Sequence, residues 1–179
     1  QTGALNGVRS WESTFRPYVA NRLRIETLTV NYRTPAQLME LATAVLRQTG
    51  LHQPAPVSAR TTEWDPVFTA VPDVPDAVAG IVRDELDLVG AGTLGVITPH
   101  SLLDRVRKAV DDVLADRVAV LTVPQAKGLE FDGVVLVEPA AIASESVRGR
   151  NDLYVAITRA TRRLHVLHAS PLPSGLEQG

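Results

Sequence analysis

Apolar positions along the chain fall into two alternating patterns. Some runs are short and almost continuously apolar, which is typical of strands buried on both faces of a sheet. The runs between them repeat apolar residues three and four positions apart, which is the spacing of an amphipathic helix. The predicted strands are residues 25–30, 67–70, 93–99, 117–123, 133–139 and 164–169.

The predicted helices have recognisable boundaries. The first begins with Thr34 as its N-cap and Pro35 in its first turn, and Gly50 ends it. Residues 51–66 contain three prolines and little periodicity, so a surface loop is predicted there. Ser101 is predicted to cap a later helix. The further predicted helices are residues 76–89, 101–115 and 151–163.

Strands that alternate with helices predict an α/β fold with a mainly parallel sheet and helices on both faces. The link formed by residues 124–132 is short for a parallel crossover, which usually needs about a dozen residues. Ligands of such sheets usually bind beyond the carboxyl ends of the strands. This rule selects the loops after Val30, Thr98, Thr122 and Val137 and the start of the last helix.

Composition narrows the function classes. A chain of 179 residues suits one domain with a real core. It contains no cysteine, which excludes disulfides and thiolate metal sites and fits the cytoplasm, where we expect the protein to act. No signal peptide or apolar span of about 20 residues is present, so no membrane association is expected. The net charge of −2 gives no overall reason for nucleic-acid binding, so any such contact must be local.

Metal binding is not predicted. His165 and His168 lie three positions apart in a predicted strand, so their side chains point to opposite faces and suit a shared metal poorly. Trp64 lies in no basic aromatic cluster, so it is expected to pack an edge of the domain rather than bind bases.

Tyr32 and Arg33 form the first candidate site, directly after a predicted strand and before a predicted helix. Tyrosine offers a flat face on which a ring can stack, and arginine offers a planar fork of donors that suits phosphate. The pair is equally typical of a half-buried tyrosine beside a solvated arginine at a helix start. The residue types alone favour that second interpretation.

The second candidate is the loop that holds Lys127, Gly128 and Glu130. Lysine suits an anion, glycine allows close approach of the backbone, and glutamate accepts hydrogen bonds from hydroxyl groups. A polar surface turn with a charge pair has the same composition. The loop by itself does not decide between a ligand site and a turn.

Arg159 is the third candidate, within the predicted helix over residues 151–163. At helical spacing it shares one face with Asp152 and Val155, and the opposite face is apolar. Arg159 is therefore expected to point away from the core, toward either a phosphate or solvent. Isolated helix arginines are usually solvated.

Three strings that contain these candidates occur in a recognisable order. LTVNYRTPAQLMELA, LTVPQAKGLEFDGVVLVEP and NDLYVAITRATRRLHVL resemble motifs four, five and six of the UvrD/Rep-type superfamily 1 helicases. The resemblance implies a RecA-like fold of the P-loop NTPase type. It also implies that this is the second of two such domains that close over ATP.

The resemblance implies a role for each candidate residue. Tyr32 would stack on adenine, Arg33 would contact the γ-phosphate, and Glu130 would bind the ribose or nearby nucleotide groups. Gly128 would belong to the nucleotide-binding loop. Arg159 would be the arginine finger, the catalytic residue that stabilises charge on the transferred phosphoryl group.

Nucleic-acid contacts implied by the resemblance involve Thr122 and Lys127. The family commonly has threonine, any residue and histidine where this chain has Thr122, Val123 and Pro124. Proline has neither a side-chain donor nor an N–H, so a polar contact to a nucleic-acid strand is lost there. Strand tracking in the manner of the repair helicases is therefore not expected.

Other parts of a helicase motor are missing from the sequence. Neither the phosphate-binding string G-x-x-x-x-G-K-S/T nor the acidic Mg²⁺-binding motif occurs. ATP with Mg²⁺ is therefore expected on an N-terminal RecA-like domain outside this sequence, and this fragment is not expected to hydrolyse ATP alone. The expected segments are a lead-in over residues 1–24, the RecA-like domain over residues 25–170 and a flexible tail over residues 171–179.

Further strings resemble one branch of these proteins. SWESTFRPYV, AKGLEFD and VEPAAI are similar to the HelD-like helicase-related ATPases, which bind RNA polymerase. RNA polymerase is therefore the expected partner, besides the N-terminal domain of the same protein. A repair-type helicase fragment that acts on DNA or RNA is one alternative, and a protein-binding module with a vestigial nucleotide groove is another.

Overall fold

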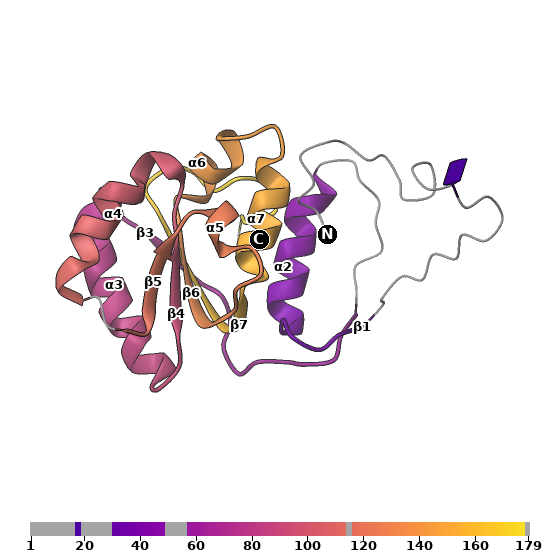
Figure 1. Cartoon of the computed structure of the whole chain (residues 1–179), viewed down its shortest axis with the longest axis horizontal. Helices are drawn as coiled ribbons and strands as arrows, with labels where there is room; N and C mark the ends of the chain where they lie inside the picture. Colours follow the sequence, from indigo (N-terminus) through magenta and orange to yellow (C-terminus); the bar gives the residue numbers. More distant parts are fainter. Residues whose placement is uncertain (1–16, 19–29, 49–56, 114–115, 178–179) are drawn as a thin grey trace.

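The computed structural model of the chain describes residues 17–18, 30–48, 57–113 and 116–177 (Figure 1). Its main sheet has five strands, and every neighbouring pair in it is parallel. A separate parallel pair joins β1 (Val30–Asn31) to β2 (Val57–Ser58). The order across the main sheet is β3 (Val67–Ala70), β7 (Ala160–His168), β6 (Phe131–Val137), β4 (Leu94–Ile97) and β5 (Val118–Leu121).

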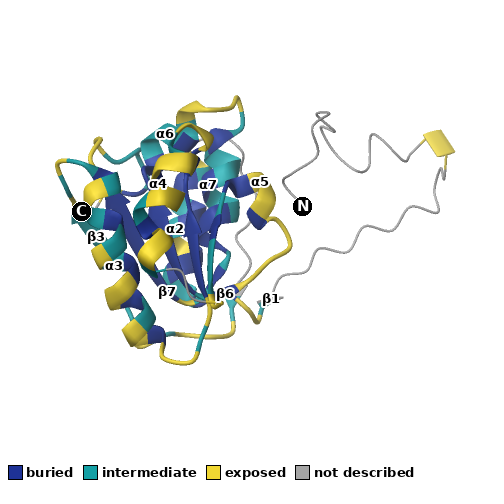
Figure 2. Cartoon of the chain, turned by 60° about the vertical axis from the view of Figure 1, so that its left-hand side comes forward, coloured by how far each residue is buried: buried dark blue, intermediate teal, exposed yellow. Residues whose placement is uncertain are grey.

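Helices cover both faces of this sheet (Figures 1 and 2), which confirms the predicted architecture. One face carries α3 (Val74–Val89) and α4 (Leu103–Val110), with short 3-10 turns on either side of α4 (His100–Leu102 and Asp111–Val113). The other face carries α2 (Ala36–Arg47), α5 (Val123–Ala126), α6 (Pro139–Ser144) and α7 (Gly149–Ile157).

Strand β6 shows why the strands read as continuous apolar runs. Val134 and Leu136 pack with residues of α2 and α7, whereas Val135 and Val137 pack with residues of α3 and α4. Successive side chains of a strand point to opposite faces, so a sheet covered twice buries them all. None of the four is more than 1% exposed.

The predicted helix over residues 151–163 is wrong in its second half. Helix α7 ends at Ile157, and β7 begins at Ala160. From there the chain pairs with β6, where Phe131 lies opposite Ala160. This long-range pairing outweighs the local helical pattern, as tertiary context often does. Arg159 therefore lies in the turn between α7 and β7 and not on a helix.

Three predicted strands are two residues too long at their carboxyl ends, and the one predicted over residues 93–99 ends at Ile97. The strand predicted over residues 117–123 ends at Leu121, and α5 follows. Pro124 lies in the first turn of α5, where a missing N–H leaves no hydrogen bond unmade. The strand predicted over residues 133–139 ends at Val137, and a proline opens α6.

The link between β5 and β6 does not join neighbouring strands, because β4 lies between them. Helix α5 is a single turn, and the chain returns to the amino end of the sheet directly after it. The connection therefore consists of one helical turn and a direct return, and it stays short although it passes one strand.

The predicted N-cap of α2 is also wrong. The helix begins at Ala36 with Pro35 as its N-cap, and Thr34 is buried. The turn before it is held instead by Asn31. Its side-chain oxygen accepts hydrogen bonds from the N–H of Arg33 (2.8 Å) and of Thr34 (3.2 Å).

The two helices on the other face also begin at residues other than those predicted. Ser101 lies in the 3-10 turn before α4, and its N–H (2.9 Å) and hydroxyl (3.0 Å) donate to Glu145 Oε1 rather than cap a helix. Helix α3 begins at Val74, earlier than predicted. Asp73 is its N-cap and accepts a hydrogen bond from the N–H of Asp76 (3.3 Å).

The tail predicted to be flexible, residues 171–179, packs onto the domain as far as residue 177, where the description ends. Leu176 is fully buried in the core on the α2 and α7 face. Arg150 of α7 donates hydrogen bonds to the carbonyl (3.1 Å) and the hydroxyl (3.3 Å) of Ser174. These contacts attach the described part of the segment to the core, and its flexibility stays a prediction.

Some predictions lie outside the described residues. The strand predicted over residues 25–30 is described only at Val30, and Gly50 is not described. Within the loop predicted over residues 51–66, residues 57–58 form β2, so that prediction is wrong there. Among the described helices, none is long and apolar enough to cross a bilayer.

A buried charged cluster, here called the Glu85 cluster, joins α3 to β7. Glu85 accepts hydrogen bonds from Arg163 Nε (2.8 Å) and lies 2.9 Å from His165 Nδ1. The other ring nitrogen of His165 lies 2.8 Å from the Thr69 hydroxyl on β3. Arg163 also stacks over Trp64, 4.1 Å from the ring centroid. Trp64 thus packs the edge of the domain, as predicted.

Candidate nucleotide site

Four of the predicted site residues meet at the amino ends of β6 and β7. Glu130 directly precedes β6, Arg159 directly precedes β7, and the N–H of Phe131 donates to the carbonyl of Arg159 (3.0 Å). Arg33 reaches Glu130 from the turn before α2, next to Tyr32. The prediction that the ligand loops gather at the carboxyl ends of the strands is wrong for this group. Pairing of the two strand starts brings Glu130 and Arg159 together instead.

Arg33 and Glu130 form an ion pair with 2.7 Å between Nη2 and Oε1. Both side chains remain about half exposed, so the pair is weak and can be exchanged for other partners. The Asn31 turn directs the neighbouring Tyr32 outward, where it is 72% exposed. Leu129 beside the pair is also exposed. The charges thus lie next to free apolar surface that could stack or pack against another molecule.

Arg159 is fixed by contacts to the main chain on two sides. Its Nε donates to the carbonyl of Val155 (3.1 Å) and its Nη1 donates to the carbonyl of Leu129 (3.0 Å). Its Nη2 also lies 3.4 Å from the Thr158 hydroxyl. A guanidinium has five N–H donors, so two remain for a ligand. The position of the Arg159 side chain is therefore fixed, and two of its N–H donors remain able to bind a ligand.

The electrostatics of the site favour an anion. Burial lowers the pKa of the Arg159 guanidinium, and the nearby charge of Arg33 lowers it further, while Glu130 acts in the opposite direction. Arginine stays charged at neutral pH despite such shifts. Two guanidinium groups therefore lie near one carboxylate, and only that of Arg33 forms an ion pair with it. A phosphate that approached them would relieve their repulsion and form charge-assisted hydrogen bonds.

The loop before β6 gets its shape from Gly128, whose φ of +86° favours glycine. This turn presents the Leu129 carbonyl to Arg159. Lys127, just before it, has its Nζ 3.9 Å from the Asp152 carboxylate of α7. A Cβ on Gly128 would meet nothing within 4 Å, so glycine is needed here for its backbone angle and not for space.

One segment that has known relatives contains most of this site. It includes the loop before β6 and the turn before β7. Residues 117–167 match the UvrD-like helicase C-terminal domain family. This UvrD-like segment contains the candidate residues Gly128, Glu130 and Arg159. Tyr32 and Arg33 precede it, and the structure brings Arg33 to it through the ion pair with Glu130.

One solved structure agrees with the fold. The C-terminal domain of a possible DNA helicase from Lactobacillus plantarum WCFS1 superposes with a TM-score of 0.60 at 20% identity, over 82% of this chain and 92% of that one. This likeness shows the fold and is consistent with a RecA-like domain. The helicase nsp10 of PRRSV gives a TM-score of 0.39 at 18% identity over 77% of this chain and 23% of that one, which is too low to carry an argument. No curated protein matches the chain.

Two residues of the UvrD-like segment were predicted to face nucleic acid, and the structure gives both a local partner. Thr122 is 8% exposed, and its N–H (2.9 Å) and hydroxyl (3.0 Å) donate to Gln125 Oε1 at the start of α5. The Lys127 amine lies near Asp152. Thr122 is thus not accessible to a ligand in this structure. The Lys127 side chain is partly exposed, so a ligand can reach it.

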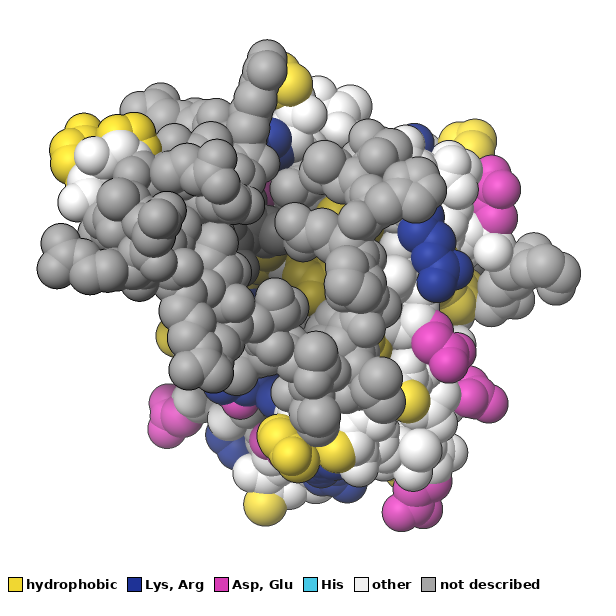
Figure 3. Space-filling view, turned by 90° about the vertical axis from the view of Figure 1, so that its right-hand side faces the viewer, with side chains coloured by type: hydrophobic (Ala, Val, Ile, Leu, Met, Phe, Trp, Pro, Cys, Tyr) yellow, Lys and Arg dark blue, Asp and Glu magenta, His cyan; other side chains and the backbone are white. Residues whose placement is uncertain are grey.

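Charged side chains of both signs are mixed over the described part of one face of the molecule. On the face in Figure 3, the described Lys and Arg side chains are interspersed with Asp and Glu side chains, and they form no broad basic patch. Phosphate backbones are usually bound by concentrated positive charge. The described part of this face therefore supports local contacts at a few residues.

The carboxyl ends of the strands, where the ligand was expected, are held together by the protein's own carboxylates. Glu145 accepts hydrogen bonds from the N–H of His100 (2.9 Å) and of Ser101 (2.9 Å). Glu138, with a φ of 45°, accepts one from the N–H of Ala169 (2.6 Å) through Oε1. Its Oε2 is buried without a partner among the described residues. These contacts tie the loops after β4, β6 and β7 to one another.

Sequence reasoning missed the residues that support the site. The Leu129 carbonyl and Asp152 hold Arg159 and Lys127, but a backbone oxygen and a lone aspartate leave no pattern to find. Asn31 had a usable signal, because asparagine side chains often hold turns by accepting a hydrogen bond from the backbone N–H two residues further on. Among the described residues, no group of three or more His, Asp or Glu side chains is placed to hold a metal ion.

Proposed function

We propose that this chain is the second RecA-like motor domain of a helicase-like ATPase. In this proposal it closes over ATP with Mg²⁺ bound to a first RecA-like domain of the same protein. The observation that carries it is that the Arg33–Glu130 ion pair lies beside Arg159 and an exposed tyrosine, although these residues come from distant parts of the chain.

Each residue has a distinct task in this proposal. Tyr32 stacks on the adenine, for which its exposed ring is suited. Arg33 leaves Glu130 and contacts the γ-phosphate, while the released carboxylate accepts hydrogen bonds from ribose hydroxyls. Gly128 sets the loop that carries Glu130. On nucleotide binding, the ion pair between Arg33 and Glu130 would therefore be replaced by contacts of both side chains to the nucleotide.

Arg159 is the catalytic residue of the proposal. Its two free donors point to a role at the transferred phosphoryl group, where negative charge is stabilised as the bond to the leaving oxygen breaks. The bonds to Val155 and Leu129 fix the guanidinium before ATP arrives, so little reorganisation is needed. Mg²⁺ supplies charge neutralisation on the phosphates and is held by the first domain.

Binding of a nonhydrolysable ATP analogue to the full-length protein tests this function. Arg33→Ala is expected to weaken binding by about 10- to 100-fold, because a hydrogen-bonded charge pair to phosphate is lost. Titration calorimetry measures the change. The matched control is Arg83→Ala, an exposed arginine on α3, on the opposite face of the sheet. Unchanged affinity of the Arg33 variant would favour a protein-binding module with a vestigial nucleotide groove.

The partner that we propose for the motor is RNA polymerase, as in the HelD-like branch. The strings that resemble this branch support it, together with the first-turn position of Pro124, where the helicases commonly have histidine. Thr122, which is occupied by its contact to Gln125, also supports a motor that does not track along a strand.

Purified RNA polymerase distinguishes this partner from DNA. The full-length protein is expected to co-elute with the polymerase and to release it from a stalled transcription complex when ATP is added. Arg159→Ala is expected to keep binding and to lose release, because the substitution leaves the surface outside the site intact. ATP-driven unwinding of a DNA duplex without any polymerase binding would instead favour a repair-type helicase.

A further inference from the structure

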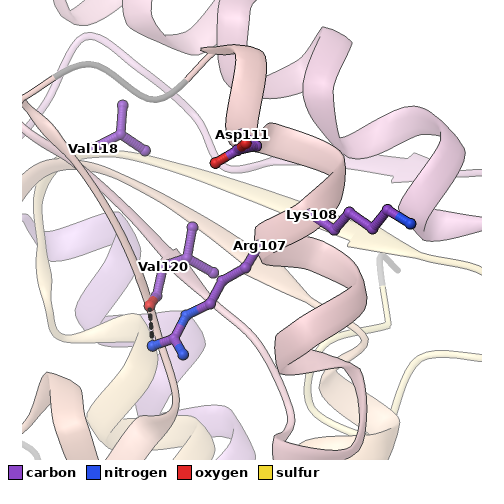
Figure 4. A pocket seen from close by; sticks show the side chains of 5 residues that line it. All are labelled: Arg107, Lys108, Asp111, Val118 and Val120. Atoms are coloured by element: carbon purple, nitrogen blue, oxygen red, sulfur yellow. Dashed lines mark hydrogen bonds between the residues drawn. The ribbon is translucent and has the colours of Figure 1, made fainter.

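The edge strand β5 has no strand on its outer side among the described residues. Exposed strand edges are templates for pairing with another strand, and proteins usually cover or distort them. A cleft of about 530 Å³ lies between this edge and α4 (Figure 4). Its lining residues are Arg107, Lys108, Asp111, Val118 and Val120.

The pairing with β4 determines which backbone groups of β5 are free. The carbonyls of Arg117 and Leu121 accept hydrogen bonds from β4 and the residue after it, Leu94 (2.9 Å) and Thr98 (3.0 Å). Backbone direction alternates along a parallel strand. The N–H and carbonyl groups of the two valines, residues 118 and 120, therefore point outward.

The charges of α4 are arranged along this edge at a matching interval. Arg107 Nη2 donates to the outward carbonyl of Val120 (3.3 Å), and Asp111 lies one helix turn further along and lines the same cleft as Val118 (Figure 4). Four helix residues rise ~6 Å and two strand residues rise ~6.6 Å, so the two spacings agree. One end of the free edge is thus positive and the other is negative.

We propose that this edge pairs with the same edge of a second copy of the chain. In an antiparallel pairing about a two-fold axis at Ala119, each Val118 lies opposite the second copy's Val120. The four outward groups of each strand then form hydrogen-bonded pairs. The same axis places Arg107 of one copy beside Asp111 of the other, twice. Arg107 exchanges its contact with Val120 for that carboxylate.

Self-complementarity favours a second copy over other occupants. A C2 interface requires each charge to meet its opposite after rotation, and Arg107 and Asp111 satisfy this. A bound anion is less suitable, because Lys108 extends away from the two valines in Figure 4 and Asp111 faces the same cleft. The proposal does not depend on the nucleotide function, since α4 and β5 carry none of the nucleotide residues.

The dimer is expected to be weak. Strand β5 has four residues, so the pairing is short, and interfaces of such size are usually transient. We expect a dissociation constant of about 10 µM to 1 mM. Sedimentation equilibrium of the purified chain up to about 1 mM covers this range.

Val118→Pro is expected to abolish the dimer. Proline removes the outward N–H of residue 118 in both copies, and it is tolerated in an edge strand where that N–H is not used inside the sheet. Val118→Thr keeps the N–H and a similar shape, and it is expected to dimerise like the unchanged chain. Circular dichroism of both variants shows whether the fold is kept.

Charge reversal gives a second test that does not depend on the backbone. Arg107→Asp and Asp111→Arg are each expected to weaken the dimer about tenfold, because symmetry applies each change twice. The double variant is expected to restore it, since the opposite charges meet again. A chain that stays monomeric up to 1 mM overturns the proposal, and so does a dimer that Val118→Pro leaves unchanged or that the double variant does not restore.

Discussion

Replacing Arg159 by alanine in the full-length protein is expected to lower ATP turnover by about 10³- to 10⁵-fold, the range known for arginine fingers. The guanidinium would stabilise charge that develops only in the transition state, so affinity for ATP itself should change much less. Steady-state phosphate release measures turnover, and titration with a nonhydrolysable analogue measures affinity.

Arg162→Ala is the matched control for this experiment. Arg162 is exposed on β7, three positions from Arg159, and its side chain is not part of the site. Turnover is expected to remain within a factor of about two. If Arg159→Ala left turnover unchanged, the finger role would be wrong. Turnover by the isolated chain that disappears with Arg159→Ala would contradict the need for a first domain.

Replacing Glu85 by alanine is expected to lower the free energy of unfolding by about 3–5 kcal/mol. The substitution leaves Arg163 buried without its carboxylate, and removal of one partner of a buried ion pair has about this cost. Urea denaturation measures the difference. Asp84→Ala, at the exposed neighbouring position of α3, is the control and should stay within about 0.5 kcal/mol. A loss below 1 kcal/mol would show that the cluster contributes little.

The same cluster predicts a pH dependence. Burial by itself would raise the pKa of Glu85, but the hydrogen bonds from His165 and Arg163 and the Arg163 charge outweigh it and lower the pKa to about 2. A lowered carboxyl pKa stabilises the fold above the unfolded value near 4.5, and this contribution is lost as the pH falls toward 2. It amounts to about 3 kcal/mol at neutral pH.

Unfolding measured between neutral pH and pH 2 tests this dependence. The difference in unfolding free energy between the unchanged chain and Glu85→Gln is expected to shrink steadily below pH 4.5. Glutamine keeps the shape of the side chain and removes the titrating group. Parallel curves for the two proteins over this interval would show that Glu85 does not titrate with a lowered pKa.

The sequence was a good guide to the layers of the fold. Continuous apolar runs such as that of β6 predicted a sheet covered on both faces. Alternate side chains of the strand pack into the two cores on opposite faces of the sheet, so all of them must be apolar. It was a poor guide to where Arg159 lies. The string around this residue has helical spacing, but the segment from Ala160 onward pairs with β6, and no local pattern records a partner that distant.

The candidate residues themselves were visible in the sequence. Tyr32, Arg33, Glu130 and Arg159 occur in three strings that resemble helicase motifs, and their chemistry suits a nucleotide. Their meeting place was predicted at the wrong end of the sheet. The rule that ligands bind beyond the carboxyl ends of strands applies to loops that follow a strand. Glu130 and Arg159 instead directly precede β6 and β7.

By itself, the sequence determined the alternation of strands and helices, the double burial of the sheet and the residue types available for chemistry. These follow from side-chain periodicity and from short strings, which are local properties. Only the tertiary structure decided the strand order, the shared position of Arg33, Glu130 and Arg159, and the free edge of β5. Each of these depends on hydrogen bonds and charge contacts between segments far apart in the chain, which no local pattern encodes.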